Sequence, residues 1–337
     1  MLRTAPVQTF LAHRAAEFLS RQLGTEVVVG NFRLNWFLDA VITDIKVLDK
    51  HNKILLQAGK IRANVKSIDF EKHRLYLNEI SLETADINLV TYKGDSSMNL
   101  QFIIDHFSSS TIDTTPSVPW LLQIENIKLK ESHFALCDER YMSPGKGIDF
   151  SDLDISNLNL GVKNIVFSGD SIQANIMLLT CKEKSGFRLD DFTANIVACP
   201  RGLKADKLQI TTAKSRLSMD LKFEYDSWNA YGYFLDSIRI TANILPSQLD
   251  MRDIVSFAPD IDGMEDVFDF SGKIRGTVSS FSARDFQFAF GKSTSFKGDI
   301  IMNGLPNVEE TFINLKTEIW IYEIRTTTNG DVDLPSW

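Results

Sequence analysis

The side chains that most often bind metals or act as nucleophiles are few in this chain and far apart. No histidine belongs to an HxxxH or HExxH pattern, which would place two metal ligands on one helix face. No pair of cysteines has the CxxC spacing of zinc or thioredoxin-like sites, and their strand-like surroundings favour buried free thiols. The residues in question are His13, His51, His73, His106, His133, Cys137, Cys181 and Cys199.

Two short motifs resemble functional ones but lack the residues that would complete them. The triplets Gly94-Asp95-Ser96 and Gly169-Asp170-Ser171 read GDS, as in some serine esterases, but no Asp stands three residues before any His. Both triplets are predicted turns. The acidic run 259–269 fits a calcium loop only in its middle, because Ala258 falls at the first ligand position and Asp269 replaces the bidentate Glu. We find no P-loop or GxSxG motif, and we predict a non-enzymatic protein without metal or cofactor.

The composition narrows the class of protein. The chain has 337 residues, of which 44% are hydrophobic and 24% charged, as in globular proteins. The net charge of −8 and the scattered Lys and Arg residues argue against a nucleic-acid partner, whose phosphates need a clustered basic surface. No run of about 18 apolar residues predicts a membrane-spanning helix. No signal peptide is recognisable, and the start at Met1 fits a trimmed chain.

One long helix and two short ones are predicted. Residues 5–23 carry apolar side chains at helical spacing, with Gly24 as the stop. The polar side of this helix is only weakly basic, so we expect it to pack on a sheet rather than lie on a membrane. Short helices are expected within 96–107 and within 247–259, the latter with Ser247 as N-cap. The apolar residues assigned to the long helix are Val7, Phe10, Leu11, Phe18 and Leu19.

From Thr25 onward the apolar residues alternate with polar ones, which predicts antiparallel strands with one dry face. The polar, proline-bearing stretch 111–119 reads as a linker. A loose repeat links 80–89, 127–136 and 208–219, where alternation stops, the chain turns or bends, and alternation resumes. The predicted strands lie at 27–34, 41–48, 61–65, 75–89, 122–136, 153–167, 172–178, 192–198, 208–210, 217–225, 238–244, 286–290 and 312–321.

The dry face of so many strands needs a cover. Each Phe or Leu side chain left exposed forgoes about 1.5–3 kcal/mol, and one long helix with two short ones cannot shield the whole sheet. Three arrangements remain: two sheets packed as a sandwich, a closed barrel, or a sheet folded into a trough whose apolar lining holds a ligand. Periodicity alone does not separate them, and general frequencies favour the sandwich.

The stretch 270–311 resembles the TamB proteins, the inner-membrane half of the translocation and assembly module, within the AsmA-like group. The resemblance is carried by the glycines from Gly272 to Gly276, the zigzag from Phe286 to Phe290, the Thr-x-Phe-x-Gly step at 294–298, and Gly-Leu-Pro at 304–306. The N-terminal helix and the elements at 53–65, 78–90 and 99–107 resemble the same family in order. The resemblance therefore covers essentially the whole chain, without the family's N-terminal anchor and C-terminal domain.

The resemblance implies a mainly β fold, a long twisted antiparallel sheet curled into an open apolar trough. It divides the chain into the helix at 1–24 and trough modules at 25–115, 116–246 and 247–337. It also implies a periplasmic segment that conducts phospholipids between the inner and outer membranes. The missing anchor would join the inner membrane, and the missing C-terminal region would meet an outer-membrane partner of the Omp85 type.

The side chains expected to line the lipid groove are the apolar members of the alternating runs, although a bulge or a one-residue slip would reverse the face. Two other functions stay open. One is a scaffold for the assembly of outer-membrane β-barrel proteins, and the other is a closed sandwich module for structure or adhesion. The lining candidates are Val41, Ile45, Val47, Ile61, Val65, Leu82, Ile87, Ile127, Leu129, Ile172, Ile176, Leu217, Met219, Leu221, Phe223, Ile238, Ile240, Phe286, Phe288, Phe290, Ile300 and Met302.

Overall fold

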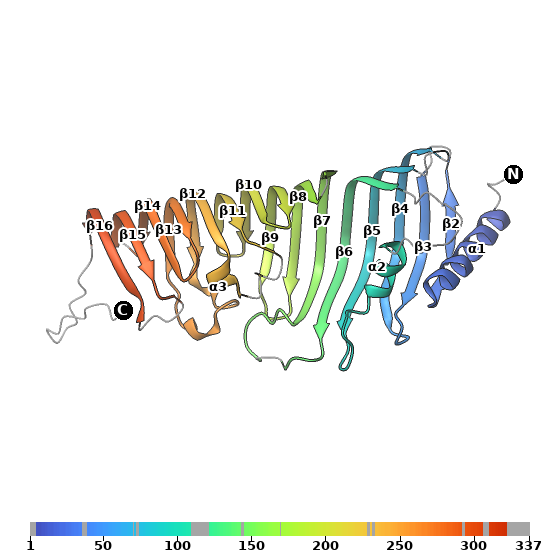
Figure 1. Ribbon diagram of the computed structural model, residues 1–337, viewed down its shortest axis with the longest axis horizontal. Coiled ribbons are helices and arrows are strands. Elements are labelled where there is room, and N and C mark those ends of the chain that lie inside the picture. Colours follow the sequence, from blue (N-terminus) through green and yellow to red (C-terminus); the bar gives the residue numbers. More distant parts are fainter. Residues whose placement is uncertain are drawn as a thin grey trace. The chain divides into compact units, whose positions relative to one another are not determined.

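The computed structural model describes residues 5–35, 39–69, 71, 74–108, 121–142, 145–168, 170–227, 230, 233–291, 294–305 and 310–321 (Figure 1). Its helices are α1 (Ala5–Leu23), α2 (Gln101–Ser108), α3 (Phe234–Ser237), α4 (Met251–Ile254) and the 3-10 helix η2 (Pro259–Ile261). Its strands are β1 (Val27–Val28), β2 (Asn31–Leu34), β3 (Asp39–Leu48), β4 (Ile54–Asp69), β5 (Arg74–Thr91), β6 (Leu121–Asp138), β7 (Asp152–Ser168), β8 (Ser171–Glu183), β9 (Arg188–Cys199), β10 (Gly202–Thr212), β11 (Arg216–Glu224), β12 (Arg239–Asp250), β13 (Val267–Gly276), β14 (Ser280–Phe290), β15 (Thr294–Asn303) and β16 (Phe312–Ile321).

All of these strands belong to one sheet, in the order in which they occur in the chain, with β2 paired to β3 beside β1. The prediction of a mainly β fold built on one long sheet is confirmed. The described strands show neither a second sheet nor a pairing between β1 and β16, so they form neither a sandwich nor a closed barrel. The prediction of a wholly antiparallel sheet is wrong at one place, because β5 and β6 run parallel. The chain between them carries α2 and re-enters the sheet from the other end.

Two of the three predicted helices are confirmed, and the third is partly wrong. Residues 5–23 form α1 as predicted, and α2 occupies the second half of the predicted 96–107 segment, ending one residue beyond it. The prediction of a helix over 247–259 is wrong over its first turn, because Ser247 to Asp250 continue β12. The N-cap of the short α4 is Asp250, whose carboxylate accepts the Arg252 amide, and Ser247 lies buried in the strand. The linker at 111–119 lies outside the described residues.

The contacts divide the chain into two units. Unit 1 comprises Met1–Val166 with Ala174–Asp190, and unit 2 comprises Phe167–Gln173 with Asp191–Trp337. The predicted modules, with limits at 115 and 246, do not coincide with these units and stay a prediction. The two units are described separately below.

Several long strands, in unit 1 and in unit 2, carry a non-glycine residue in the left-handed backbone region within their length. These are Asp44 (φ 55°), Thr84 (φ 51°), Glu131 (φ 47°), Asn157 (φ 52°), Asn164 (φ 54°), Lys207 (φ 52°) and Asp285 (φ 51°). Such a residue bends the strand and shifts the alternation of side chains by one position. In β14 it follows Phe281 and Ala283 and precedes Phe286, so that all three side chains remain on one face. We call these positions the creases of the sheet.

The amide nitrogens at several creases lose their ladder partner and are satisfied by a polar side chain from the next strand. The Glu131 amide donates to Asn159 Oδ1 (2.9 Å), the Lys207 amide to Asp220 Oδ1 (2.8 Å), and the Asp285 amide to Asp299 Oδ1 (3.1 Å). The Ala85 amide, next to Thr84, donates in the same way to Ser132 Oγ (3.3 Å). The contact of the Ala85 amide is buried, where an amide without a partner would cost about 1–3 kcal/mol, and the contact with Ser132 offsets that cost.

The creases account for two of the three copies of the loose repeat in the sequence. In its first two copies, Thr84 and Glu131 fall where the alternation breaks, and β5 and β6 lie side by side with Glu83 opposite Lys130. In the third copy, the break is the tight turn between β10 and β11, where the Thr212 amide donates to the Ser215 carbonyl. The first two copies are therefore bends within one strand and the third is a hairpin, so the repeat does not correspond to a single structural unit.

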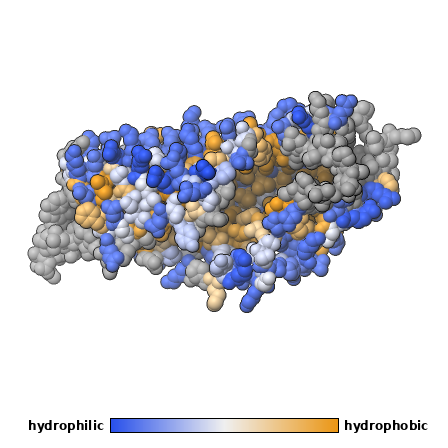
Figure 2. All heavy atoms as spheres, viewed as in Figure 1, coloured by the Kyte–Doolittle hydropathy of each residue, from blue (hydrophilic) through white to orange (hydrophobic). Residues whose placement is uncertain are grey.

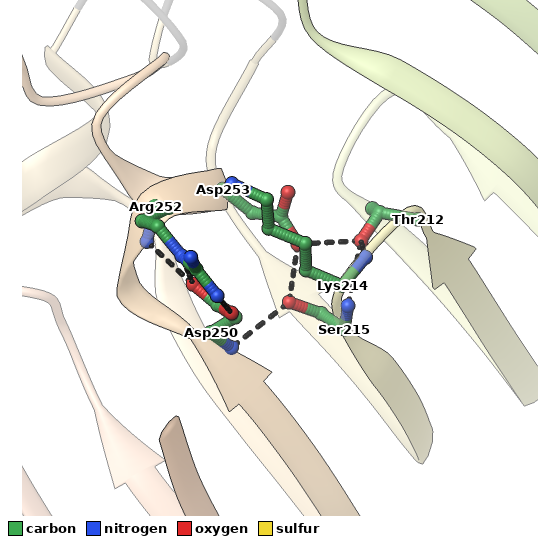
Figure 3. A network of polar contacts seen from close by, with 6 residues as sticks. All are labelled: Thr212, Lys214, Ser215, Asp250, Arg252 and Asp253. Atoms are coloured by element: carbon green, nitrogen blue, oxygen red, sulfur yellow. Dashed lines mark hydrogen bonds and ion pairs between the residues drawn. The ribbon is translucent and has the colours of Figure 1, made fainter. Parts of the chain in front are cut away.

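The sheet margin that carries the turn between β3 and β4 uses acidic or hydroxyl side chains to hold its turns. Asp49, Asp138, Asp149, Glu183, Thr212 and Asp250 each accept the amide two residues further on. In unit 2 this pattern becomes a network (Figure 3). Thr212 and Ser215 each donate a hydroxyl to Asp253 at 2.5 Å, and Arg252 pairs with Asp250 through two nitrogens.

Candidate functional site

The register of unit 2 places its apolar side chains on one face of the sheet. Residues directly opposite each other on neighbouring strands point to the same side. Phe223 pairs with Leu203 and Ile240, while Phe288 pairs with Phe270 and Phe296. The predicted lining residues that share this face are Leu217, Met219, Leu221, Phe223, Ile240, Phe286, Phe288, Phe290, Ile300 and Met302.

The phenylalanine zigzag of β14 is the densest part of this face. The Phe288 ring lies 5.0 Å from Phe268 and 5.7 Å from Phe290, measured between ring centroids, and 6.4 Å from Phe286. All four rings are only half-buried. Ring pairs at these distances stabilise one another by about 0.5–1.5 kcal/mol beyond the area that they bury. The rings therefore pack laterally along the sheet and leave their outer surfaces to water or to a ligand.

Unit 1 carries a matching apolar face. Leu82 pairs with Ile61 and Leu129, and Leu129 pairs in turn with Leu160. Figure 2 shows apolar side chains lining a hollow over β5 to β7, with hydrophilic side chains along its margins. The predicted lining residues that share this face are Ile45, Val47, Ile61, Val65, Leu82, Ile87, Ile127 and Leu129.

Two helices cover the beginning of the unit 1 face (Figure 1). Ala12, Ala16 and Leu23 of α1 are buried against the first strands, and Leu100 with Phe102 and Ile103 of the α2 segment pack on the same cluster. Lys50 joins the two helices, because its ammonium donates to the Leu23 carbonyl (2.6 Å) at the end of α1 and lies 4.7 Å from the Phe102 ring centroid. In unit 2 the described cover is much smaller, with Phe234 of α3 at 5.7 Å from Phe223.

The opposite face of the sheet is polar. In unit 2 it bears short ion pairs along single strands, such as Lys204 with Asp206 and Lys222 with Glu224, both at 2.6 Å. Two open hollows of about 680 Å³ and 560 Å³ are lined by polar residues such as Gln248, Ser271 and Lys273 together with apolar ones, among them Phe288 and Ile274. The two faces thus differ in chemistry: one offers charges and amides, and the other offers hydrocarbon.

The titratable groups serve the architecture. His133 of β6 bridges Asp86 of β5 (2.7 Å) and Asp154 of β7 (3.1 Å), and the hydrogen bond to Asp86 is the main cause that raises the pKa of His133. Burial opposes ionisation of Asp49, but hydrogen bonds from Tyr92, Asn99 and two amides outweigh it and lower the pKa of Asp49. Burial raises the pKa of both the Cys137 and Cys181 thiols, so neither is an activated nucleophile. The three cysteines are free and half-buried.

Some predicted lining residues lie elsewhere. Val41 pairs with Arg62 and points away from its neighbour Ile42, which belongs to the unit 1 cluster, because the crease at Asp44 shifts the alternation. Ile238 precedes β12 at the end of α3 and is fully buried. In β8, Ile172 is 45% exposed and Ile176 is half-buried.

The apolar residues predicted for α1 differ in their burial. Leu19 packs against the unit 1 cluster, whereas Phe10 is 57% exposed and lies under the Arg14 guanidinium at 5.3 Å. The side chains of Val7, Leu11 and Phe18 lie outside the described residues. The buried face of α1 was missed in the sequence because it is built on alanines, Ala12 and Ala16, which let the helix approach the strands closely.

The sequence also missed several side chains of the apolar face. Phe268, Phe270, Phe281 and Ala283 belong to it, as does Ile274 opposite Ala242. The signal that could have found them is an alternation that resumes after two adjacent polar residues, as Arg284 and Asp285 separate Ala283 from Phe286. No group of three or more His, Cys, Asp or Glu side chains in the described part of the chain is arranged to hold a metal ion.

No family model, curated protein or solved structure matches the chain. Among the described helices, none combines the length and the apolar character needed to cross a bilayer.

Proposed function

We propose that the apolar face binds phospholipid acyl chains and conducts them along the sheet. The observation that supports this most directly is the row of apolar cross-strand pairs from β10 to β15. It stays on one face despite a register shift in every strand pair, most of its large side chains are half-buried, and no second layer is described over it. Each methylene moved from water onto such a face contributes about 0.8 kcal/mol. A face without buried polar anchors holds acyl chains without fixing them at one point, which is what passage requires.

The proposal extends to the fold and the setting. The described sheet is open, since β1 and β16 do not pair, and we propose that its apolar face forms the inside of a shallow, open trough. An open side would leave charged head groups in water, where their solvation is retained. On the TamB resemblance, the chain would be a periplasmic segment of an envelope protein that passes phospholipids between the inner and outer membranes, joined to each by parts outside this sequence.

The test is native mass spectrometry of the purified chain, followed by organic extraction of the bound material. We expect one or more phospholipids per chain. Phe288→Asp should remove them, and so should Leu221→Asp. Gln287→Asp is the matched control, because Gln287 lies next to Phe288 on the polar face of the same strand. A lipid-free wild-type chain, or equal lipid loss in the Gln287→Asp control, would exclude the apolar face as the binding surface.

A second function is favoured by the last described strand. β16 pairs with β15 on one side, and no described strand occupies its other side. An open edge can accept an added strand from another chain. A scaffold for outer-membrane β-barrel clients would use this edge, and it predicts binding of extended β-strand peptides with no bound lipid.

A further inference from the structure

The connection between β6 and β7 exposes three large apolar side chains that the sheet does not use. Tyr141 is 66% exposed, Met142 95% and Phe150 67%. They lie in the segment 139–151, which is much longer than the β3–β4 and β8–β9 turns of the same unit. The loop emerges at the lower margin of unit 1 in Figure 1.

Two turns hold these side chains in place. The Tyr141 amide donates to the Asp138 carbonyl and the Asp152 amide to the Asp149 carbonyl, each at 3.1 Å. The Asp138 amide donates to the Ser151 carbonyl at 2.7 Å, which sets the two turns side by side. The carboxylates of Asp138 and Asp149 then accept the Arg140 and Ser151 amides, as elsewhere along this margin. The exposed side chains therefore project from ordered turns.

The charged residues around the three side chains indicate which kind of partner this segment could bind. Arg140 is neutralised by two contacts with Asp138, at 2.8 Å and 2.6 Å, and Lys146 is accompanied by Glu139 and Asp152 nearby in the sequence. The segment thus offers no excess positive charge to attract anionic head groups or an acidic protein. Its chemistry is that of side chains found at the membrane–water boundary: a tyrosine with a polar tip, a phenylalanine and a flexible methionine.

We propose that Tyr141, Met142 and Phe150 insert into the surface of a phospholipid bilayer. The loop leaves the sheet at β6 and β7, the strands under the apolar hollow of unit 1, so insertion would bring that hollow to a source of lipid. Insertion itself needs only the loop and does not depend on lipid conduction. Because apolar burial drives it, binding should be weak, reversible and insensitive to salt.

The experiment is flotation of the full chain with vesicles of phosphatidylcholine and phosphatidylethanolamine, at low salt and at high salt. We expect the wild-type chain to float equally at both salt concentrations. Replacing both apolar side chains, Met142→Asp with Phe150→Asp, should weaken binding by at least about tenfold, given the apolar area removed. Met142→Leu should keep the binding. Tyr233→Asp is the control, because Tyr233 is 75% exposed in unit 2 and lies outside the loop.

Three results would overturn the proposal: no flotation of the wild-type chain, flotation of the double variant at the wild-type level, or loss of flotation at high salt. Far-ultraviolet circular dichroism checks that the double variant is folded. Native mass spectrometry separates this proposal from lipid conduction, because a variant that no longer floats but keeps its co-purified phospholipid has lost only the membrane contact.

Discussion

The two units build the same kind of sheet and differ in what covers it. Both carry creases with left-handed residues and an apolar face opposite a polar one. In unit 1, α1 and α2 close over the first strands, and ten apolar residues are buried in one cluster. In unit 2 the corresponding cluster has only three, Ala194, Ala205 and Leu208. The first strands of unit 1 thus hold a conventional core, whereas the described part of unit 2 relies on lateral contacts within the sheet.

The amount of cover over the apolar face determines whether that face mainly stabilises the fold or can bind a ligand. A covered face contributes to folding but has no room for a ligand, while a half-exposed face can accept one because its hydrophobic stabilisation is incomplete. Because the described residues of unit 2 cover its apolar face less than α1 and α2 cover the first strands of unit 1, a bound lipid should matter most in unit 2.

The first prediction compares the buried carboxylate of Asp49 with the partly buried carboxylate of Asp253, which lie at the same margin of the sheet. Asp49 of unit 1 is fully buried and accepts the Tyr92 hydroxyl (2.6 Å) and the Asn99 amide group (3.0 Å). Asp49→Ala should lower the free energy of unfolding by about 3–5 kcal/mol, because it leaves the Tyr92 hydroxyl and the Asn99 amide group without their hydrogen-bond acceptor. Asp253→Ala in unit 2, which releases Thr212 and Ser215, should cost about 1–3 kcal/mol. Urea unfolding measures both, and equal losses would contradict the contrast between the units.

The second prediction compares apolar truncations. Ile45→Ala removes a side chain buried under α1 and α2 and should cost about 2–4 kcal/mol. Phe288→Ala removes a larger side chain, but one that is half-exposed, and should cost less than Ile45→Ala despite its size. Thermal unfolding of the lipid-free chain checks the order. A larger loss for Phe288→Ala would mean that the unit 2 face is covered after all.

The third prediction concerns lipid and unit 2. If phospholipid binds the uncovered face, amides of β11 to β15 should exchange more slowly in its presence, by a factor that corresponds to about 2.7 kcal/mol at a hundred times the dissociation constant. The strands β3 and β4, already covered by helices, should show little change. Hydrogen exchange with mass spectrometry resolves the two regions. Uniform protection across both would show that cover does not decide where lipid binds.

The fourth prediction uses a pH response confined to unit 1. Because the folded-state pKa of His133 is raised by Asp86 and Asp154, its stabilising contribution is full below about pH 6.5 and is lost as the pH rises through the folded value. The side chain is 36% exposed, so solvent screening keeps the effect below about 1 kcal/mol. His133→Gln should flatten this alkaline loss in urea titrations at several pH values. A wild-type chain that gains stability over this range would disprove the assignment.

The fifth and smallest effect should be equal in the two units. Thr84 in unit 1 and Lys207 in unit 2 both occupy the left-handed region, which costs a non-glycine residue roughly 1–2 kcal/mol. Thr84→Gly and Lys207→Gly should each stabilise the chain slightly, by about 0.5–1 kcal/mol after the entropy lost by glycine. Paired denaturation curves test this. A loss at either site would show that the crease depends on side-chain contacts rather than on the backbone.

The sequence predicted most strands because period-two alternation follows directly from the strand geometry, but its strand list left out β13 and β15. It predicted α1 because a 19-residue helix displays its period clearly. The sequence put Val41 on the wrong face and did not extend the β14 zigzag to Phe281. In both strands a left-handed residue shifts the alternation by one position, so that side chains before and after it change faces relative to a regular strand. The sequence also missed the parallel pairing of β5 and β6. Apolar and polar residues alternate in the same way in parallel and antiparallel strands that have one dry face. Only the path of the connecting chain distinguishes the two pairings.

That parallel pair has a consequence for the order of folding. Most other neighbouring strands are joined by a short connection and can zip together locally, whereas β5 and β6 meet only after the whole segment 92–120 has closed. Loop closure of this kind slows folding much more than it lowers stability. The chain should therefore nucleate separately on the two sides of this seam, β1 to β5 and β6 onward, with their joining as the slow step. Lengthening the connection should delay that step and leave the folded protein almost as stable as before.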